Sequence, residues 1–369
     1  MTEPGAFDIR EFELPDLGPN DVLMRVERNG ICGTDIHISE GGMDLDFPIL
    51  PGHEFSGYVE AMGEEVETDA HDRPLAEGDS ITGMPFWKVE EDWYSRNMPH
   101  REQIFTGIAG LGLEPAETGN VGGMSEYVLM PAETDVFKLP DELEVAHGAL
   151  AEPMSIAVHA YERLTEAGFP LIGEGAGLGS SIAVQGVGPI GLLMVAVADY
   201  AGSDQIIAVD ALGDRLELAR EFGATDTVDI TACDGEDEIV QAVKDCTDHG
   251  LGPDGVIEAT GVPQSVRQAI EIPHDGGYFV EAGHYAYSGE VEINPTRIVQ
   301  KELTILGSKA APSGQFGTGV KILGDIVDDV PLDDLFNHPV EMTVDAVEDA
   351  YETQAAGEAL RASIHPHGT

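Results

Sequence analysis

Basic side chains are scarce in this chain of 369 residues, where 18 Lys and Arg stand against 69 Asp and Glu and give a formal net charge of −51. So large a negative charge repels nucleic acid and anionic membranes, and it excludes both as partners. Disorder from high charge is the alternative interpretation, but periodic hydrophobic residues run through nearly the whole chain. Concentrated salt would screen the repulsion, because the Debye length falls to roughly 3 Å at molar ionic strength. The composition therefore predicts a folded, halophilic protein.

Cysteine is also rare, with three residues at Cys32, Cys233 and Cys246. They are too few and too scattered for a disulfide framework, which is typical of a reducing compartment. No apolar run approaches the ~20 residues that span a bilayer, and residues 1–15 lack the features of a signal peptide. We expect a cytoplasmic protein.

The pattern of the chain changes near residue 157. Before it, short apolar runs separated by Gly, Pro and Asp indicate a β-rich, barrel-like domain. After it, strand-like runs alternate with amphipathic helical ones, which predicts a doubly wound parallel sheet. We predict an α/β protein of two domains, with the tail returning to the first: residues 1–156 and 310–369, and residues 157–309.

The stretch "QGVGPIG" (185–191) follows an apolar strand and opens a helix. Its three glycines have the G-x-G-x-x-G spacing that lets a backbone approach a pyrophosphate at a helix N-terminus. The alternative is a tight strand-to-helix turn without a ligand. We expect a dinucleotide site formed by Gly186, Gly188, Pro189, Ile190 and Gly191.

Asp210 ends the next apolar run, 24 residues after Gly186. An acidic residue at this distance binds the adenosine ribose, and its charge repels the 2′-phosphate of NADP. The sequence therefore favours NAD. Arg215 lies close enough in sequence to offset that repulsion, although its helical position predicts a side chain directed to solvent.

Cys32 stands in "NGICGTDIH" (29–37), 21 residues before the adjacent His53 and Glu54 of "PGHEFSG" (51–57). Taken alone, a cysteine is more often a small core residue. Together with Glu152, however, these residues supply the Cys, His and carboxylate ligands of a catalytic zinc, with one position open.

At this point the chain resembles the zinc-dependent medium-chain alcohol and polyol dehydrogenases over essentially its whole length. The resemblance depends on "GICGTDIH", "GHEFSG" and "GVGPIG" followed by Asp210, in that order. The run "AEPMSIAVHA" (151–160) is similar to the polyol, sugar and threonine dehydrogenases of the family. The resemblance implies a GroES-like catalytic domain joined to a Rossmann domain.

By the same resemblance, Cys32 and His53 are zinc ligands, and Glu54 or Glu152 completes the shell directly or through water. Asp35 corresponds to the family residue that hydrogen-bonds the ligand histidine and sets its tautomer. A simple Asx turn is the alternative role for Asp35.

The resemblance also implies a mechanism. Zinc lowers the pKa of the substrate hydroxyl, and the nicotinamide ring accepts hydride. Thr34 and His37 correspond to the family's proton relay, which passes through the nicotinamide ribose to the surface. His37 as an ordinary exposed histidine is the alternative.

The chain departs from the family in residues 84–124, where most members carry four cysteines that hold a structural zinc. No cysteine occurs here, so we expect one catalytic zinc and no structural zinc. The segment holds Trp87, Arg96 and Arg101, which would form a substrate-binding lobe for an anionic group. A small satellite core with balancing charges is the alternative.

We expect an oxidoreductase that transfers hydride from a secondary alcohol of a polyol, sugar or sugar acid to NAD. A metal-free quinone or enone reductase of the same fold is one alternative, although it predicts the loss of Cys32 and His53. A non-catalytic nucleotide-binding member is another. We expect a homodimer or homotetramer.

Overall fold

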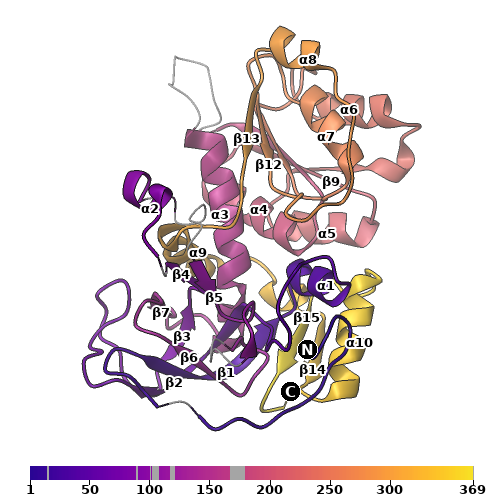
Figure 1. Cartoon of the computed structure of the whole chain (residues 1–369). Helices are drawn as coiled ribbons and strands as arrows, with labels where there is room; N and C mark the ends of the chain where they lie inside the picture. The colour runs from indigo at the N-terminus through magenta and orange to yellow at the C-terminus, as the bar shows by residue number, and fades with distance from the viewer. Residues whose placement is uncertain are drawn as a thin grey trace. The chain divides into compact units, whose positions relative to one another are not determined.

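The computed structural model describes residues 1–14, 16–88, 90–99, 101, 108–116, 121–166 and 179–368. The chain divides into two compact units, which we call unit 1 and unit 2. Unit 1 comprises Met1–Ser155, Ala311–Val327 and Leu332–Thr369, and unit 2 comprises Ile156–Ala310 and Asp328–Pro331. Figure 1 shows the strands and helices of each unit along the chain.

Unit 1 is built on a seven-stranded sheet with the order β14-β15-β1-β2-β3-β7, in which β6 also pairs with β1. Its strands are β1 (Val22–Gly30), β2 (Glu54–Met62), β3 (Ser80–Gly83), β6 (Tyr127–Met130), β7 (Val136–Lys138), β14 (His338–Glu341) and β15 (Ala362–His365). A separate pair is formed by β4 (Phe86–Lys88) and β5 (Ile108–Gly110). Its helices are α1 (Gly33–Ser39), α2 (Trp93–Asn97), α9 (Ser313–Ile326) and α10 (Val344–Ala355), with the 3-10 turns η3 (Val145–Leu150) and η5 (Leu332–Leu335).

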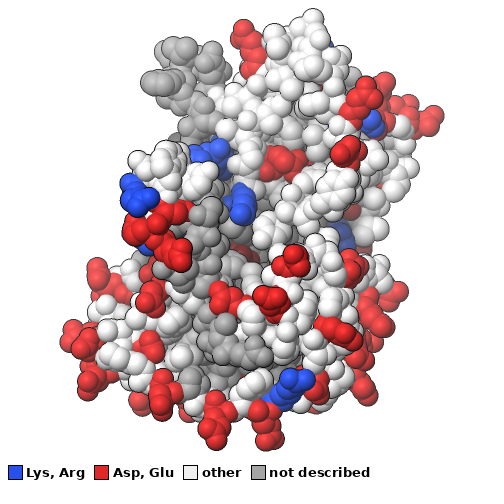
Figure 2. All heavy atoms as spheres, viewed as in Figure 1, with Lys and Arg blue, Asp and Glu red and all other residues white. Residues whose placement is uncertain are grey.

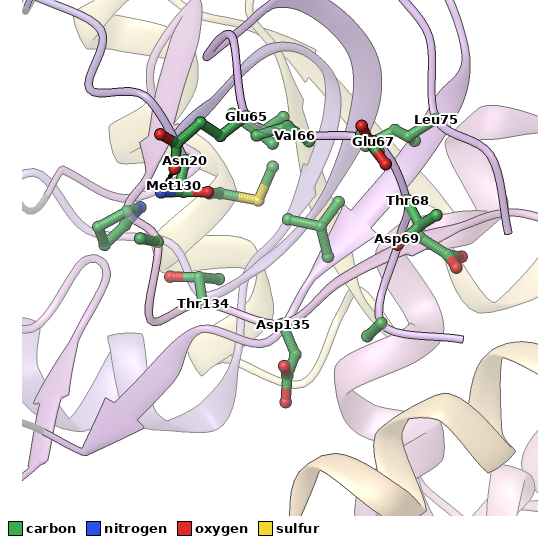
Figure 3. A pocket seen from close by; sticks show the side chains of 15 residues that line it. Asn20, Glu65, Val66, Glu67, Thr68, Asp69, Leu75, Met130, Thr134 and Asp135 are labelled. Atoms are coloured by element: carbon green, nitrogen blue, oxygen red, sulfur yellow. Dashed lines mark hydrogen bonds between the residues drawn. The ribbon is translucent and has the colours of Figure 1, made fainter. Parts of the chain in front are cut away.

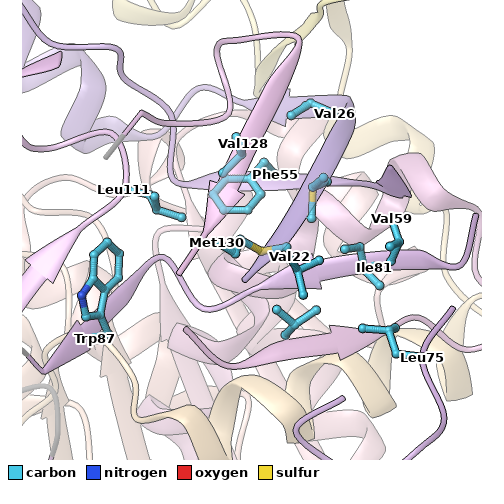
Figure 4. Packing of buried hydrophobic residues seen from close by; sticks show 12 residues of the cluster. Val22, Val26, Phe55, Val59, Leu75, Ile81, Trp87, Leu111, Val128 and Met130 are labelled. Carbon is cyan, nitrogen blue, oxygen red and sulfur yellow. The ribbon is translucent and has the colours of Figure 1, made fainter. Parts of the chain in front are cut away.

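The core of unit 1 lies on the buried face of these strands. Alternate residues of β1, β2 and β3 point inward, since successive side chains of a strand face opposite sides. Val26, Phe55 and Ile81 are among those almost fully buried there, as Figure 4 shows. This sheet, antiparallel except for the parallel pair β14 and β15, confirms the β-rich first domain that the apolar runs predict.

Unit 2 is a six-stranded parallel sheet with the order β10-β9-β8-β11-β12-β13. Its strands are β8 (Ser181–Gln185), β9 (Gln205–Asp210), β10 (Asp226–Asp229), β11 (Gly255–Glu258), β12 (Tyr278–Glu281) and β13 (Thr304–Gly307). Its helices are α4 (Pro189–Tyr200), α5 (Gly213–Glu221), α6 (Glu236–Asp245), α7 (Pro263–Glu271) and α8 (Pro295–Gln300), with the 3-10 turn η4 (Ile230–Ala232); α3 (Ala151–Glu166) begins in unit 1 and continues in unit 2. The strand order is that of a dinucleotide-binding sheet, which places ligands at the carboxyl ends beside β8 and β11. The predicted doubly wound sheet is confirmed.

On the face that Figure 2 shows, acidic side chains are scattered among other residues and outnumber the basic ones. A surface hollow of about 470 Å³ in unit 1 is lined partly by Glu65, Glu67, Asp69 and Asp135 (Figure 3), and none of the residues that line it is a predicted site residue. Among the described helices, none is long and apolar enough to cross a bilayer.

Candidate active site

The pairing of β1 with β2 brings Cys32 and His53 together. Gly30, at the end of β1, is directly opposite Glu54, at the start of β2. In an antiparallel pair, the residues that follow the end of the first strand lie at the same edge of the sheet as the residues that precede the start of the second strand. Cys32 and His53 therefore converge there, although 21 residues separate them in sequence.

The three predicted ligands Cys32, His53 and Glu54 each offer a ligand atom within 4.8 Å of the others. His53 and Glu54 are buried, and Cys32 is half-buried. Asp35 is fully buried behind them, with Oδ1 3.8 Å from His53 Nδ1. Its Oδ2 accepts a hydrogen bond of 2.9 Å from the Cys32 amide, so Asp35 also holds the Cys32 backbone at the start of α1.

Burial acts against the charged forms of Cys32, His53 and Glu152 at this site. It raises the pKa of the Cys32 thiol, and the charge of Glu54 raises it further. Burial opposes the charged form of His53, but Asp35 and Cys32 outweigh it and raise the His53 pKa well above its usual value. Burial also raises the pKa of Glu152 to about 7, against the effect of His53. A divalent cation among these groups would favour the deprotonated forms that coordinate it.

The residues present fit a zinc ion. Asp35 Oδ1, His53 Nδ1 and Glu54 Oε1 are buried and have no hydrogen-bond partner among the described residues. Because Nδ1 of His53 faces Asp35, the other ring nitrogen is available as a ligand. A thiolate, an imidazole and a carboxylate form the donor set of a catalytic zinc site.

Arg361 is a residue of this site that the sequence analysis missed. Its guanidinium donates to Oε2 of Glu54, and both side chains are buried. Arg361 precedes β15, which pairs with β1 on the side opposite β2, so Arg361 and Glu54 meet across Gly30. A Cβ at Gly30 would lie 2.5 Å from Glu54 Oε2, which explains the glycine. No local pattern could have indicated this pair, because 307 residues separate its members.

Glu152 and the two relay residues occupy different positions around this group. Glu152 is half-buried in the first turn of α3, and the charges of His53 and Glu54 both act on it. The sulfur of Cys32 is 3.6 Å from Thr34 Oγ1. The side chain of His37 is 47 % exposed, and its Nδ1 is 4.0 Å from Glu40 Oε2.

The glycine stretch in unit 2 forms a turn between β8 and α4. Gly186 has a φ of +83°, which favours glycine, and Gly188 is the N-cap of α4. A Cβ at Gly191 would collide with the carbonyl oxygen of Gly186, so close packing requires this glycine as well. Pro189 and Ile190 begin α4, where proline is compatible with the first turn. This open helix N-terminus fits the pyrophosphate of a dinucleotide.

Asp210 and Arg215 both lie beside this turn. Asp210 Oδ2 accepts from the Val187 amide at 2.9 Å, and Oδ1 accepts from the amides of Ala211 and Leu212. Arg215 is half-buried, and its Nη1 lies 3.8 Å from where a Cβ of Gly188 would be. Part of the Arg215 side chain therefore remains exposed to solvent, as its helical position predicts, while its guanidinium reaches the glycine turn.

The three predicted lobe residues differ in burial. Trp87 is 9 % exposed and belongs to the core of unit 1 (Figure 4), which favours the satellite-core alternative for this residue. Arg96 is exposed on α2, and Arg101 is half-buried. Residues 89, 100, 102–107 and 117–120 lie outside the described part of the lobe.

Two family models match this chain, one mainly within unit 1 and the other mainly within unit 2. Residues 18–141 match the alcohol dehydrogenase GroES-like domain, and residues 189–323 match the zinc-binding dehydrogenase domain. The chain is 30 % identical to L-threonine 3-dehydrogenase of Francisella tularensis subsp. mediasiatica over 314 residues, or 83 % of this chain and 81 % of that protein. The chain therefore belongs to the zinc-binding alcohol dehydrogenase family, with a GroES-like domain and a Rossmann domain.

Solved structures of the family superpose over almost the whole chain. An alcohol dehydrogenase of Thermotoga maritima has a TM-score of 0.86 and 26 % identity, with 97 % of this chain and 95 % of that chain covered. The structure of 2R,3R-butanediol dehydrogenase of Bacillus subtilis has a TM-score of 0.81 and 28 % identity, with 100 % of this chain and 98 % of that chain covered. A protein assigned as a zinc-binding dehydrogenase from Sinorhizobium meliloti 1021, bound to NADP, has a TM-score of 0.83 and 30 % identity, with 99 % of this chain and 97 % of that chain covered.

Proposed function

We propose that this protein oxidises a secondary alcohol of a polyol, sugar or sugar acid, with one catalytic zinc and with NAD as hydride acceptor. The observation that carries the proposal is the convergence of Cys32, His53 and Glu54 around buried, unpartnered polar atoms. A metal-free quinone or enone reductase would have no use for this donor set, and a purely regulatory nucleotide-binding protein would not need it.

Each residue at this site has a distinct task. Cys32 and His53 would hold the zinc, and Asp35 would orient His53 through Nδ1. Glu54 is the carboxylate whose ligand atom lies within 4.8 Å of those of Cys32 and His53. Its Oε1 accepts no hydrogen bond and could coordinate the zinc, while Arg361 donates to Oε2. Glu152 faces the same group from α3 and is the alternative ligand. When bound, zinc acts as a Lewis acid on the substrate hydroxyl, and the nicotinamide accepts hydride.

The proton released from the substrate needs a path out of this partly buried site. The Thr34 hydroxyl beside the Cys32 sulfur is placed to accept it, and His37 on the same helix reaches solvent. An exposed imidazole can exchange a proton with bulk water.

The preference for NAD is supported by the carboxylate of Asp210 at the end of β9. The position of Arg215 beside Gly188 and the NADP bound to the Sinorhizobium meliloti relative support the alternative, NADP. We retain NAD because Asp210 is anchored at the turn by three backbone amides, which hold its charge in place.

We also propose that the protein works in concentrated salt, in the cytoplasm, as a homodimer or homotetramer. The net charge of −51 supports function in concentrated salt, and the need for a reduced Cys32 thiol supports the cytoplasm. The homo-oligomer is supported by β13, which lies at the edge of its sheet and leaves Ile305 40 % exposed. Val299, six residues earlier in the chain, is 77 % exposed.

The deciding experiment is a substrate panel in molar KCl, with NAD and NADP, that contains polyols, aldoses, sugar acids and L-threonine. Cys32→Ser should abolish turnover while dinucleotide binding, measured by NADH fluorescence, persists. Reduction of a quinone or enone at undiminished rate by Cys32→Ser would instead support the metal-free reductase. Equal loss of turnover and dinucleotide binding would identify Cys32 as a core residue.

A further inference from the structure

A second group of metal-binding side chains lies in unit 2, at the carboxyl ends of two neighbouring strands. Glu258 ends β11 and Glu281 ends β12, and the two are direct partners in the parallel register. Laterally paired residues of adjacent strands point to the same face of a sheet, so the two carboxylates meet. His284, three residues after Glu281, completes the group.

The donor atoms of this group lie close enough together to share a single ion, although His284 Nδ1 and Glu281 Oε1 form a hydrogen bond in its absence. Nδ1 of His284 is 2.9 Å from Glu281 Oε1 and 3.4 Å from Glu258 Oε2. Donors bound about 2.1 Å from one ion lie roughly 3.0–3.4 Å apart in octahedral or tetrahedral geometry. One ligand atom from each residue lies within 4.8 Å of the others.

Glu258 directs an unsatisfied oxygen into this group. Its side chain is fully buried, and Oε1 accepts hydrogen bonds of 2.7 Å from the Thr260 amide and from Ser265 Oγ. Its Oε2 has no hydrogen-bond partner within the described chain. A Cβ at Gly283 would collide with this oxygen, so the glycine keeps it accessible. A buried carboxylate oxygen that accepts no hydrogen bond is costly, and a cation would compensate its charge.

We propose that Glu258, Glu281 and His284 bind a first-row divalent cation such as Mn²⁺ or Zn²⁺, in addition to the zinc at Cys32 and His53. Two carboxylates with one imidazole suit these ions, whereas Mg²⁺ and Ca²⁺ prefer oxygen ligands alone. The competing arrangement is a protonated His284 that bridges the two carboxylates without a metal.

Such an ion would stiffen the edge of the sheet that binds the dinucleotide. It would join the ends of β11 and β12 and fix Glu258, which holds Thr260. Thr260 in turn packs against the glycine turn, since a Cβ at Gly186 would lie 2.7 Å from Thr260 Cγ2. The ion therefore has a positioning role toward the cofactor rather than a place in hydride transfer.

The test measures Mn²⁺ binding to the full chain in molar KCl by electron paramagnetic resonance, in a Cys32→Ser/His53→Ala background that disables the first site. This background should bind one Mn²⁺ per chain, and Mn²⁺ should raise its Tm. Adding Glu281→Gln and His284→Asn should weaken Mn²⁺ binding at least about 100-fold. Glu290→Gln, which removes the same charge from an exposed position of unit 2, should leave binding unchanged.

Absence of both Mn²⁺ binding and a Tm rise in the background variant would overturn the proposal in favour of the bridging imidazolium. Unchanged binding after Glu281→Gln and His284→Asn would overturn it too. If those substitutions prevent folding, the echo-modulation spectrum of Mn²⁺ in the background variant decides: a coupled imidazole nitrogen is expected, and its absence refutes the site. Since the background lacks Cys32 and His53, the outcome does not depend on the proposed dehydrogenase activity.

Discussion

Replacement of Arg361 by Met tests the buried ion pair behind the metal-binding residues. Arg361 is 3 % exposed and Glu54 is fully buried, so neither charge is well solvated. Removing one partner of such a pair leaves an uncompensated buried charge, which costs about 3–5 kcal/mol. Met retains much of the packing of the arginine stem, so the loss reports mainly on the stranded carboxylate. We expect Arg361→Met to lower the free energy of unfolding of the metal-free protein by this amount.

Urea denaturation in molar KCl, followed by tryptophan fluorescence, measures the effect, because Trp87 is buried in the core of the same unit. The double variant Arg361→Met/Glu54→Gln removes the stranded charge and should recover at least about 2 kcal/mol. Arg10→Met is the matched control in unit 1. Arg10 and its partner Asp8 are 51 % and 53 % exposed, so its loss should stay below about 1 kcal/mol.

Two results would refute this reasoning. The first is a loss below about 1 kcal/mol for Arg361→Met, which would mean that the charge of Glu54 is solvated or neutralised without Arg361. The second is a double variant no more stable than Arg361→Met, which would show that the arginine acts through packing alone.

Three further outcomes are expected. Lowering salt from molar to about 0.1 M should inactivate the enzyme, because the Debye length grows to ~10 Å; unchanged activity and Tm in dilute buffer would remove the basis for a halophilic protein. Asp210→Ser should weaken discrimination against NADP by on the order of 1–3 kcal/mol, measured as the ratio of kcat/KM values, and an unaltered ratio would mean that another residue contacts the ribose. If the lobe binds an anionic group, Arg96→Ala or Arg101→Ala should lower the ratio of kcat/KM for a sugar acid to kcat/KM for its neutral polyol by roughly 1.5–3 kcal/mol. The basic residues would be structural if the wild type prefers the polyol and neither substitution changes this ratio.

The candidate site shows which contacts sequence could anticipate. Cys32 and His53 stand in short glycine-bounded motifs, and the pairing that joins them needs only the register of two neighbouring strands. Arg361 reaches the same site from the residue before β15, which pairs with β1 on the side opposite β2. Its contribution depends on a long-range pairing that local patterns do not encode.

The sequence by itself determined the two-domain α/β class, the glycine turn between a strand and a helix, and the Cys, His and carboxylate types of the candidate metal site. Each of these depends on local information: apolar periodicity, glycine spacing after a strand, and residue chemistry within short motifs. Tertiary structure alone decided that Arg215 lies against Gly188, that Trp87 is a core residue, and that Glu258 and Glu281 share one face beside His284. Strand order and register bring these side chains together, and both arise from packing between segments distant in the chain.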